Sequence, residues 1–303
     1  MDTQTLKYIG KDLYKTHILK EWKRYIVFMT RCHLHKGQIN DLLDFFKATP
    51  TPQRQAMLEH TTSFVEQTTR AFFYKDSTWD ERIAIVKNHI EYMENIFNDE
   101  AIAKLYVNGE RIRLWEDVYE EQPVVMELWF HGGQRKEGCL SLVLSLGADE
   151  LYQIMFWLAP SPEDNELSLW IGALQGTPNG SEIIKGLTKA FFGYRTKNLI
   201  FYGIRNVAAG LGCKHLYAVS NAGYYAMNHV RRDRKLKTSL DDFWQECEGQ
   251  VCKDQRFFEM PIEEYRKSME ELKPSKRAQH RRRFAKMDEI TESVTEVLNN
   301  YKK

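Results

Sequence analysis

The sequence predicts an α+β protein in which a helical N-terminal region precedes a mixed, largely antiparallel sheet with flanking helices. Three observations lead to this fold class. Apolar residues recur at helical spacing near the N-terminus, five β-rich runs then follow with short turns between them, and the helical spacing returns toward the C-terminus. We therefore expect a helical region over residues 1–108 and an α+β domain with a long C-terminal helix over residues 109–303.

The N-terminal region has the spacing of amphipathic helices. Its first apolar residues recur at steps of three to five: Leu6, Ile9, Leu13, Ile18, Trp22 and Ile26. Thr78 and Glu81 match a capping box, in which each side chain accepts a hydrogen bond from the other residue's backbone N–H. The helix predicted after them has one apolar face: Ile83, Val86, Ile90, Met93 and Phe97.

The five β-rich runs are separated by turn-forming residues, and short connections join antiparallel strands. We expect strands over 111–118, 123–131, 138–145, 151–159 and 166–174. Two helices should follow, near 182–192 and 198–210, and then a further strand over 215–220. Ser181 is expected to cap the first of these helices, and Ser275 to cap the long C-terminal helix.

Composition excludes several classes of protein. Charged residues cancel, with 43 Lys and Arg against 42 Asp and Glu, so the whole surface is not built for nucleic acid. Residues 90–150 are acidic, with 13 Asp and Glu against 5 Lys and Arg.

The first twenty residues lack the apolar core of a signal peptide, and no apolar run approaches the roughly 18–20 residues that cross a bilayer. Five irregularly spaced cysteines do not form a disulfide framework. We expect a cytoplasmic protein without a transmembrane segment, peripheral at the inner membrane if it acts there.

Familiar catalytic motifs are missing. The sequence has no GxxxxGK[ST] loop, no strand-linked GxGxxG, no HExxH and no GxSxG. No His and Cys cluster has metal-ligand spacing, so no metal site is predicted.

The first candidate site is the turn that joins the strand ending near Leu174 to the next helix. Backbone N–H groups at a helix start favour phosphate, and glycine allows close approach of a ligand. The residues expected to bind a cofactor here are Gln175, Gly176, Gly180, Ser181 and Lys189. The alternative is an ordinary loop of glycine, proline and asparagine.

The order of meander, glycine-containing turn, helix and strand resembles the acetyl-CoA-binding core of the GNAT acyltransferases. The resemblance implies acyl-CoA as cofactor, bound with its pyrophosphate on the helix start, and a tyrosine after the last strand that protonates the leaving thiolate. Tyr224 and Tyr225 are the candidates for this acid, since a phenol can donate a proton. The alternative is that both tyrosines pack in the core. The spacing departs from the family's loop, because Gly176 follows Gln175 directly.

Two groups of cations are candidate anion sites. Arg205 lies on a mostly apolar helix, where it must be paired or reach a groove, and Arg195 lies close to Lys189 and Lys197. The alternative for Arg205 is a salt bridge to the acidic residues 90–150.

The second group opens the last helix, where positive charge opposes the helix dipole. It contains Lys276, Arg277, Arg281, Arg282 and Arg283. We expect contact with an anionic ligand, a lipid headgroup or a protein partner, but with no sequence-specific nucleic acid, because Phe284 alone offers an aromatic ring for stacking. The alternative is solvation and pairing with the acidic segment.

Several segments together resemble the VirK/YbjX family of bacterial proteins. They occur in the family's order at residues 74–89, 171–176, 188–197, 217–221, 241–246 and 276–283, together with Arg205. The resemblance implies a cytoplasmic factor linked to virulence, envelope integrity and resistance to antimicrobial peptides, without an established catalytic mechanism. It keeps His89 as a candidate catalytic residue, although a core position is the alternative. Tyr194 and Thr196 depart from the family, in which Leu and Pro are more usual.

Overall fold

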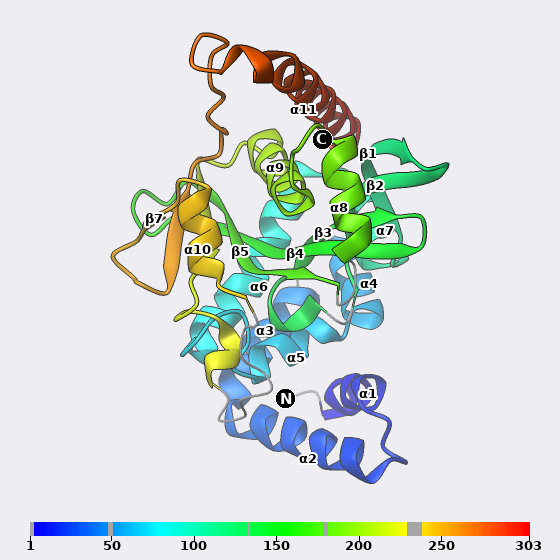
Figure 1. The fold of residues 1–303 in the computed structure, drawn as a ribbon. Helices are drawn as coiled ribbons and strands as arrows, with labels where there is room; N and C mark the ends of the chain where they lie inside the picture. Colours follow the sequence, from blue (N-terminus) through cyan, green and yellow to red (C-terminus); the bar gives the residue numbers. More distant parts are fainter. Residues whose placement is uncertain (1–2, 48–50, 132–133, 178–180, 229–237) are drawn as a thin grey trace.

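The computed structural model describes residues 3–47, 51–131, 134–177, 181–228 and 238–303 (Figure 1). The N-terminal helices are α1 (Thr3–Leu13), α2 (Leu19–Leu34), α3 (Lys36–Lys47), α4 (Pro52–His60), α5 (Ser63–Thr69), α6 (Trp79–Ile96) and α7 (Asp99–Tyr106). The strands are β1 (Arg111–Tyr119), β2 (Gln122–Trp129), β3 (Leu140–Leu146), β4 (Asp149–Pro160), β5 (Leu167–Gly176), β6 (His215–Val219), β7 (Gln250–Val251) and β8 (Phe257–Met260). The later helices are α8 (Ser181–Ala190), α9 (Thr196–Gly210), α10 (Leu240–Glu246) and α11 (Pro274–Tyr301), with short 3-10 turns η1 (Gln134–Lys136) and η2 (Tyr225–Asn228).

The strands form one sheet in the order β1-β2-β3-β4-β5-β6-β8-β7. The meander from β1 to β5 is antiparallel throughout, and β6 pairs with β8 in the same sense. β5 and β6 are parallel, because α8 and α9 return the chain to the end of the sheet at which β5 begins. The predicted α+β class with a mixed, largely antiparallel sheet is confirmed. β7, β8 and α10 were not predicted, because such short segments carry too few residues for a period.

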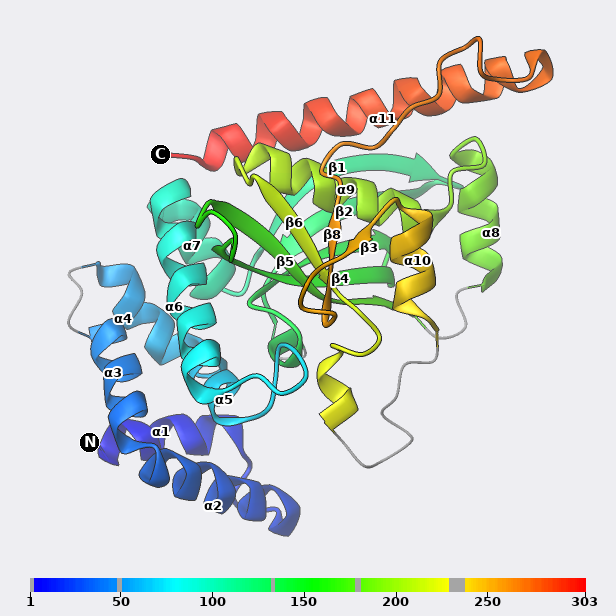
Figure 2. The same cartoon turned by 90° about the vertical axis from the view of Figure 1, so that its left-hand side faces the viewer.

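Helices cover both faces of the sheet (Figure 2). α6 packs on β4 from one side, while α9 packs on β3, β4 and β5 from the other. α11 lies against α9 and β1. In both views α11 and the pair α1 and α2 lie at opposite ends of the molecule. The predicted boundary at residue 108 falls between α7 and β1, and the buried core continues across it, with Tyr106 packed against Phe130.

The helix starts test two predicted caps. The Thr78–Glu81 capping box is confirmed: the Glu81 N–H donates to Thr78 Oγ1 at 3.2 Å, and the Thr78 N–H donates to Glu81 at 2.6 Å. The cap at Ser275 was wrong, because α11 begins one residue earlier at Pro274 and Lys273 is its N-cap residue. Proline is pre-organised for the first helical position and has no N–H to cap.

Candidate functional site

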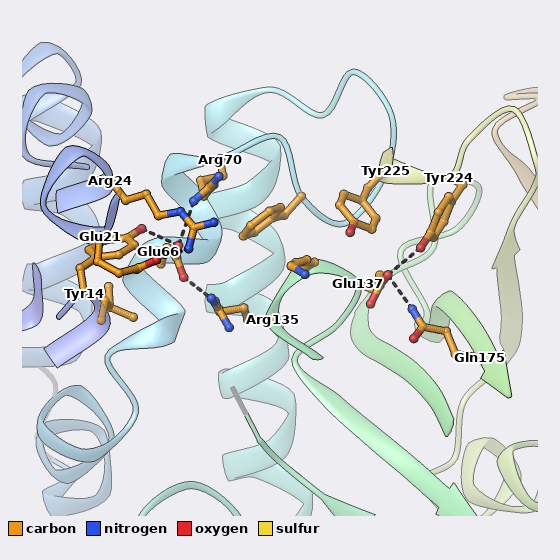
Figure 3. A pocket seen from close by; sticks show the side chains of 13 residues that line it. Tyr14, Glu21, Arg24, Glu66, Arg70, Arg135, Glu137, Gln175, Tyr224 and Tyr225 are labelled. Carbon is orange, nitrogen blue, oxygen red and sulfur yellow. Dashed lines mark hydrogen bonds and ion pairs between the residues drawn. The ribbon is translucent and has the colours of Figure 1, made fainter. Parts of the chain in front are cut away.

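A polar pocket of about 430 Å³ opens between the N-terminal helices and the carboxyl ends of β5 and β6 (Figure 3). Its walls come from the α1–α2 region, α5 and the residues after it, η1, β5 and the segment after β6. The lining residues are Leu13, Tyr14, Glu21, Arg24, Glu66, Arg70, Phe72, Arg135, Lys136, Glu137, Gln175, Tyr224 and Tyr225.

Glu137 lies at the centre of one wall and is only 4% exposed. The Tyr224 hydroxyl and the Gln175 side-chain amide each donate a hydrogen bond of 2.8 Å to its Oε1. Oε2 receives no hydrogen bond from the part of the chain that the structure describes. The carboxyl group therefore keeps one oxygen that can exchange a proton with a bound molecule.

Close backbone packing holds Glu137 in this place. Gly172 lies inside β5, where a Cβ would come within 1.9 Å of the Glu137 carbonyl oxygen. A Cβ at Gly138 would meet the backbone N of Phe156 at 2.5 Å. The buried amide of Gln67, on α5, donates to the Gly138 carbonyl at 2.7 Å. Two glycines and one buried amide thus seat the segment before β3 directly on the sheet.

The segment after β6 presents Tyr224 to the same carboxylate. A Cβ at Gly223 would lie 2.1 Å from the Arg256 carbonyl oxygen, and the Ser220 N–H donates to that oxygen at 2.8 Å. The Lys75 N–H donates to the Gly223 carbonyl at 2.7 Å. These contacts fix the turn against two other segments, so the phenol has a defined position.

Burial decides the electrostatics of this pair. Removal from water disfavours the charged carboxylate and raises the pKa of Glu137 to about 7, although the hydrogen bonds from Tyr224 and Gln175 and the nearby Lys136 act in the opposite direction. Burial and the adjacent Glu137 raise the pKa of Tyr224 well above its usual range. Glu137 therefore changes charge near neutral pH while Tyr224 stays protonated.

The opposite wall is built around a second buried carboxylate, Glu66 (Figure 3). Tyr14 donates to it at 2.5 Å, and Arg70 and Arg135 approach its two oxygens at 3.3 and 2.5 Å. Arg24 also lines the pocket and pairs with Glu21 at 2.5 Å. Four cationic and three acidic side chains line the pocket in all, which favours an anionic or polar ligand.

Three sequence-predicted residues meet in this pocket. Gln175, Tyr224 and Tyr225 all line it, and the ring of Tyr225 packs edge-on against Phe72 at 5.9 Å. The other ten lining residues were not predicted as site residues, among them Tyr14, Glu66, Arg70, Arg135 and Glu137. One feature of the sequence could have pointed to Glu137. Gly172 lies inside an apolar strand, and a glycine in that position marks the close approach of another backbone, which here is that of Glu137.

The other predicted cofactor residues do not line this pocket. A Cβ at Gly176 would meet the Tyr152 ring at 2.8 Å, so packing accounts for this glycine. Gly180 lies outside the described residues, and α8 begins at Ser181. Lys189 is exposed and lines a second hollow of about 690 Å³, formed by Tyr152, Glu182, Ile184, Lys185, Gly186, Thr188, Lys189, Arg195, Thr196 and Lys197.

His89 occupies a core position on α6, away from the residues that line the pocket. Its Nδ1 accepts the Leu158 N–H at 3.0 Å, and its Nε2 is 2.7 Å from the Tyr106 hydroxyl. Burial lowers the pKa of His89 to about 3, so the ring is neutral. Both ring nitrogens are thus engaged by the protein itself.

Arg205 and Arg195 are paired with other side chains. Arg205 is buried and approaches Glu264 at 3.2 Å, while donating to the Cys247 carbonyl at 3.0 Å. Its partner therefore does not come from residues 90–150, because the chain after β8 returns across α9. Arg195 is paired with Glu246 and donates to Asn198 at 3.0 Å.

The cations of α11 differ from one another in their contacts. Lys276, Arg281 and Arg282 are exposed. Arg277 donates to the Leu272 carbonyl at 3.2 Å, and Arg283 donates to the Phe192 carbonyl at 2.9 Å. Lys286, which follows the cluster on α11, pairs with Asp117 of the acidic segment at 3.0 Å.

The described residues contain no group of three His, Cys, Asp or Glu side chains that could hold a metal ion. Among them, no helix is both long enough and apolar enough to span a membrane. The pocket therefore contains a carboxyl group with a pKa of about 7, a phenol that is hydrogen-bonded to it, and three arginines on the opposite wall.

Comparisons with known proteins give a family but no activity. An uncharacterized protein of Escherichia coli (strain K12), YbjX, is 31% identical over 129 residues, which cover 41% of this chain and 38% of the relative. An uncharacterized protein of Haemophilus influenzae is 26% identical over 132 residues, which cover 43% of this chain and 44% of the relative. The matched region thus spans less than half the length of either relative. No solved structure matches the chain.

The family model described as "Protein of unknown function (DUF535)" matches residues 17–296, which include every strand of the described sheet and the pocket residues other than Leu13 and Tyr14. The chain therefore belongs to the DUF535 family.

Proposed function

We propose that this protein is an acyltransferase that uses an acyl-CoA donor and holds its acceptor in the pocket around Glu137. The observation that carries the proposal is the position of the Glu137 carboxyl group, bonded to Gln175 from one strand end and to Tyr224 from the other. In sheets with parallel strands, ligands bind beyond the carboxyl ends of the strands.

The course of the two parallel strands supports a ligand at this point. β5 and β6 are paired from Ser168 with His215 to Ile171 with Ala218. β5 then runs on to Gly176, whereas β6 ends at Val219 and its chain turns toward Tyr224. The pairing of the two parallel strands therefore ends where the pocket opens, and a parallel pair that separates is the feature that admits the donor in the GNAT acyltransferases.

The cations near α8 fit the phosphate groups of such a donor. Successive side chains of a strand point to opposite faces, so Gln175 faces the pocket while Gly176 faces Tyr152, which lines the second hollow. Lys185, Lys189, Arg195 and Lys197 line that hollow against one acidic residue, Glu182. A donor with phosphates in the hollow and its thioester at Glu137 would pass the end of β5.

The side chains of the pocket have complementary roles in this reaction. Ionised Glu137 takes a proton from the acceptor amine or hydroxyl as that atom bonds to the thioester carbonyl carbon. Tyr224 gives its proton to the thiolate that leaves as the carbon–sulfur bond breaks, and regains one from Glu137 across their hydrogen bond. Gln175 orients the carboxyl group, and Arg24, Arg70, Arg135 and Lys136 favour an acceptor that carries negative charge.

Calorimetric titration with coenzyme A, acetyl-CoA and a long-chain acyl-CoA tests donor binding. We expect dissociation constants within the range of about 1 μM to 1 mM that is common for enzyme substrates. Binding should weaken when Lys189 is changed to Glu and persist in Glu137→Gln. A folded protein that binds none of the three compounds would exclude the proposal.

Turnover separates the roles of the two catalytic groups. In the presence of an amine acceptor, Glu137→Gln and Tyr224→Phe should each release free thiol about 100-fold more slowly than the parent protein. Tyr225→Phe is the matched control, because the hydrogen bond to Glu137 comes from Tyr224. Equal rates in Glu137→Gln and the parent protein would remove the carboxyl group from the mechanism.

The cellular setting is part of the same proposal. The family resemblance supports a cytoplasmic bacterial factor that acts at the inner face of the envelope and contributes to virulence and to resistance against antimicrobial peptides. Loss of resistance in a Glu137→Gln strain that keeps normal protein levels would tie this setting to the pocket.

A further inference from the structure

Helix α2 presents an apolar face to solvent. Among the described residues, five of the eleven exposed large hydrophobic side chains lie on this one helix. They are Leu19 (70% exposed), Trp22 (47%), Ile26 (41%), Val27 (46%) and Leu34 (73%). Leu19, Trp22 and Ile26 follow one another at steps of three and four residues, so they share one side of the helix. A contiguous exposed patch of this kind marks an interaction surface.

The orientation of α2 is fixed by its other side. Phe28 and Cys32 are buried, and the Phe28 ring packs against Tyr14 at 6.0 Å. The helix contacts α1, α3 and α5. Rotation of α2 to bury Leu19 and Trp22 would expose Phe28 and Cys32, so the outward face has no partner among the described residues.

Basic residues accompany the apolar face. α2 contains Lys20, Lys23, Arg24 and Arg31, and its one acidic residue, Glu21, is paired with Arg24. An apolar face with tryptophan at its centre and lysine beside it is the composition of helices that lie in the interface of a membrane. Such basic segments are attracted to the negative charge of anionic lipids.

A small cationic hollow of about 200 Å³ lies along the same helix. Lys23, Arg24, Val27, Phe28 and Arg31 of α2 line it together with Tyr14, Thr69 and Arg70, and none of these is acidic. Tyr14, Arg24 and Arg70 also line the pocket that contains Glu137. The hollow therefore connects α2 with the pocket that contains Glu137.

Charge selects the occupant of this face. A second copy bound symmetrically would bring Lys20 and Lys23 against the same residues of its partner, which is a repulsive arrangement. A bilayer with anionic headgroups satisfies both features, because its acyl chains accept Leu19, Trp22 and Ile26 while its phosphates accept the lysines.

We propose that α2 docks the protein on an anionic membrane surface, with Leu19, Trp22 and Ile26 inserted at the level of the headgroups and Lys20 and Lys23 bound to lipid phosphates. This docking stands on the surface of α2 alone and does not depend on acyl transfer.

The test is co-sedimentation of the full chain with vesicles of phosphatidylglycerol and phosphatidylcholine in equal parts, and with vesicles of phosphatidylcholine alone. We expect binding to the mixed vesicles to exceed binding to phosphatidylcholine at least about tenfold. Leu19→Ser, Trp22→Ser and Ile26→Ser combined should reduce binding to the mixed vesicles at least about tenfold. Lys20→Glu and Lys23→Glu combined should abolish the preference for anionic lipid.

The matched control lies at the far end of the molecule. Arg281→Glu and Arg282→Glu combined change exposed cations of α11 and should leave vesicle binding unchanged. Lipids with bromine on the acyl chains should quench tryptophan fluorescence in the parent protein and less in Trp22→Phe. These side chains are exposed, so circular dichroism should show the same fold for every variant.

Three outcomes would overturn the proposal. The first is unchanged vesicle binding in the α2 serine variant. The second is loss of binding in the α11 variant with the α2 variants unaffected, which would assign the lipid contact to α11. The third is a dimer, detected by light scattering, that the α2 serine variant converts to a monomer, because the face would then join two copies.

Discussion

The Tyr224 hydroxyl donates a hydrogen bond of 2.8 Å to Glu137 across 87 positions of the chain. The first residue follows β6 and the second precedes β3, so the contact exists only because β5 brings the two segments to one end of the sheet. The carboxyl group is buried in this contact, and burial raises the pKa of Glu137 to about 7.

The raised pKa of Glu137 predicts how stability depends on pH. Between about pH 4.5 and pH 7 the unfolded chain loses the Glu137 proton and the folded protein keeps it, so the free energy of unfolding falls as pH rises. The total cost at pH 8 is about 3 kcal/mol for a pKa that moves from 4.5 to about 7.

The variant Glu137→Gln should therefore be more stable than the parent protein at pH 8 by up to this amount, and closely matched to it at pH 4.5. Urea unfolding at the two pH values measures the difference. Glu182→Gln, at an exposed position on α8, is the control and should show no such dependence. Equal destabilisation of Glu137→Gln at both pH values would contradict a neutral buried acid.

The seat of Glu137 predicts the effect of a single methyl group. Gly172→Ala places a Cβ at 1.9 Å from the Glu137 carbonyl oxygen, so either β5 or the segment before β3 must move. We expect a loss of about 2–3 kcal/mol in unfolding free energy, together with a lower pKa of Glu137 as water reaches the displaced carboxyl group.

Gly37→Ala is the matched glycine control for that experiment. Nothing lies within 4 Å of the Cβ position in Gly37, which is in the first turn of α3. Alanine is the better helix former by up to about 1 kcal/mol, so this variant should be neutral or slightly stabilised. A Gly172→Ala protein that behaved like Gly37→Ala in urea unfolding would show that the contact with Glu137 is not tight.

These residues also mark the limit of sequence reasoning. The helical period, the five-strand meander and the Thr78 capping box were predictable, since each depends on neighbours within a few positions. The pocket was not, because it combines Tyr14, Glu66 and Glu137 from three segments with no common spacing. Trp22 and Ile26 reveal the same limit: their spacing predicts a helix correctly, yet only the structure shows that they face solvent.

The core position of His89 predicts stability effects rather than catalytic ones. His89→Ala leaves the Leu158 N–H and the Tyr106 hydroxyl without their partner and opens a cavity, so it should cost about 2–4 kcal/mol. The pKa of His89 is about 3, so below about pH 6.5 the unfolded chain binds a proton that the folded protein does not.

Stability of the parent protein should consequently fall as pH drops from 7 to 5, and the difference from His89→Ala should shrink over this window. Urea unfolding at pH 7 and pH 5 is the measurement, and the imidazole signals in an NMR titration give an independent value. A His89 resonance that titrated near pH 6.5 would show that the ring is reached by water.

The basic start of α11 predicts different effects for neighbouring arginines. Arg283 and Gln279 both donate to the Phe192 carbonyl at 2.9 Å, where the chain turns with a positive φ of 54° at Phe192. Arg283→Ala removes one donor from this turn and should cost about 1–2 kcal/mol. Arg281→Ala and Arg282→Ala, in exposed positions, should each stay within about 0.5 kcal/mol of the parent protein in thermal unfolding.

Reversal of the charge at Arg281, Arg282 and Arg283 together would therefore not distinguish a damaged turn at Phe192 from the loss of an anion contact. The pair Arg281 and Arg282 alone tests the contact, and an Arg283→Ala protein as stable as the parent would show that Gln279 holds the turn without it.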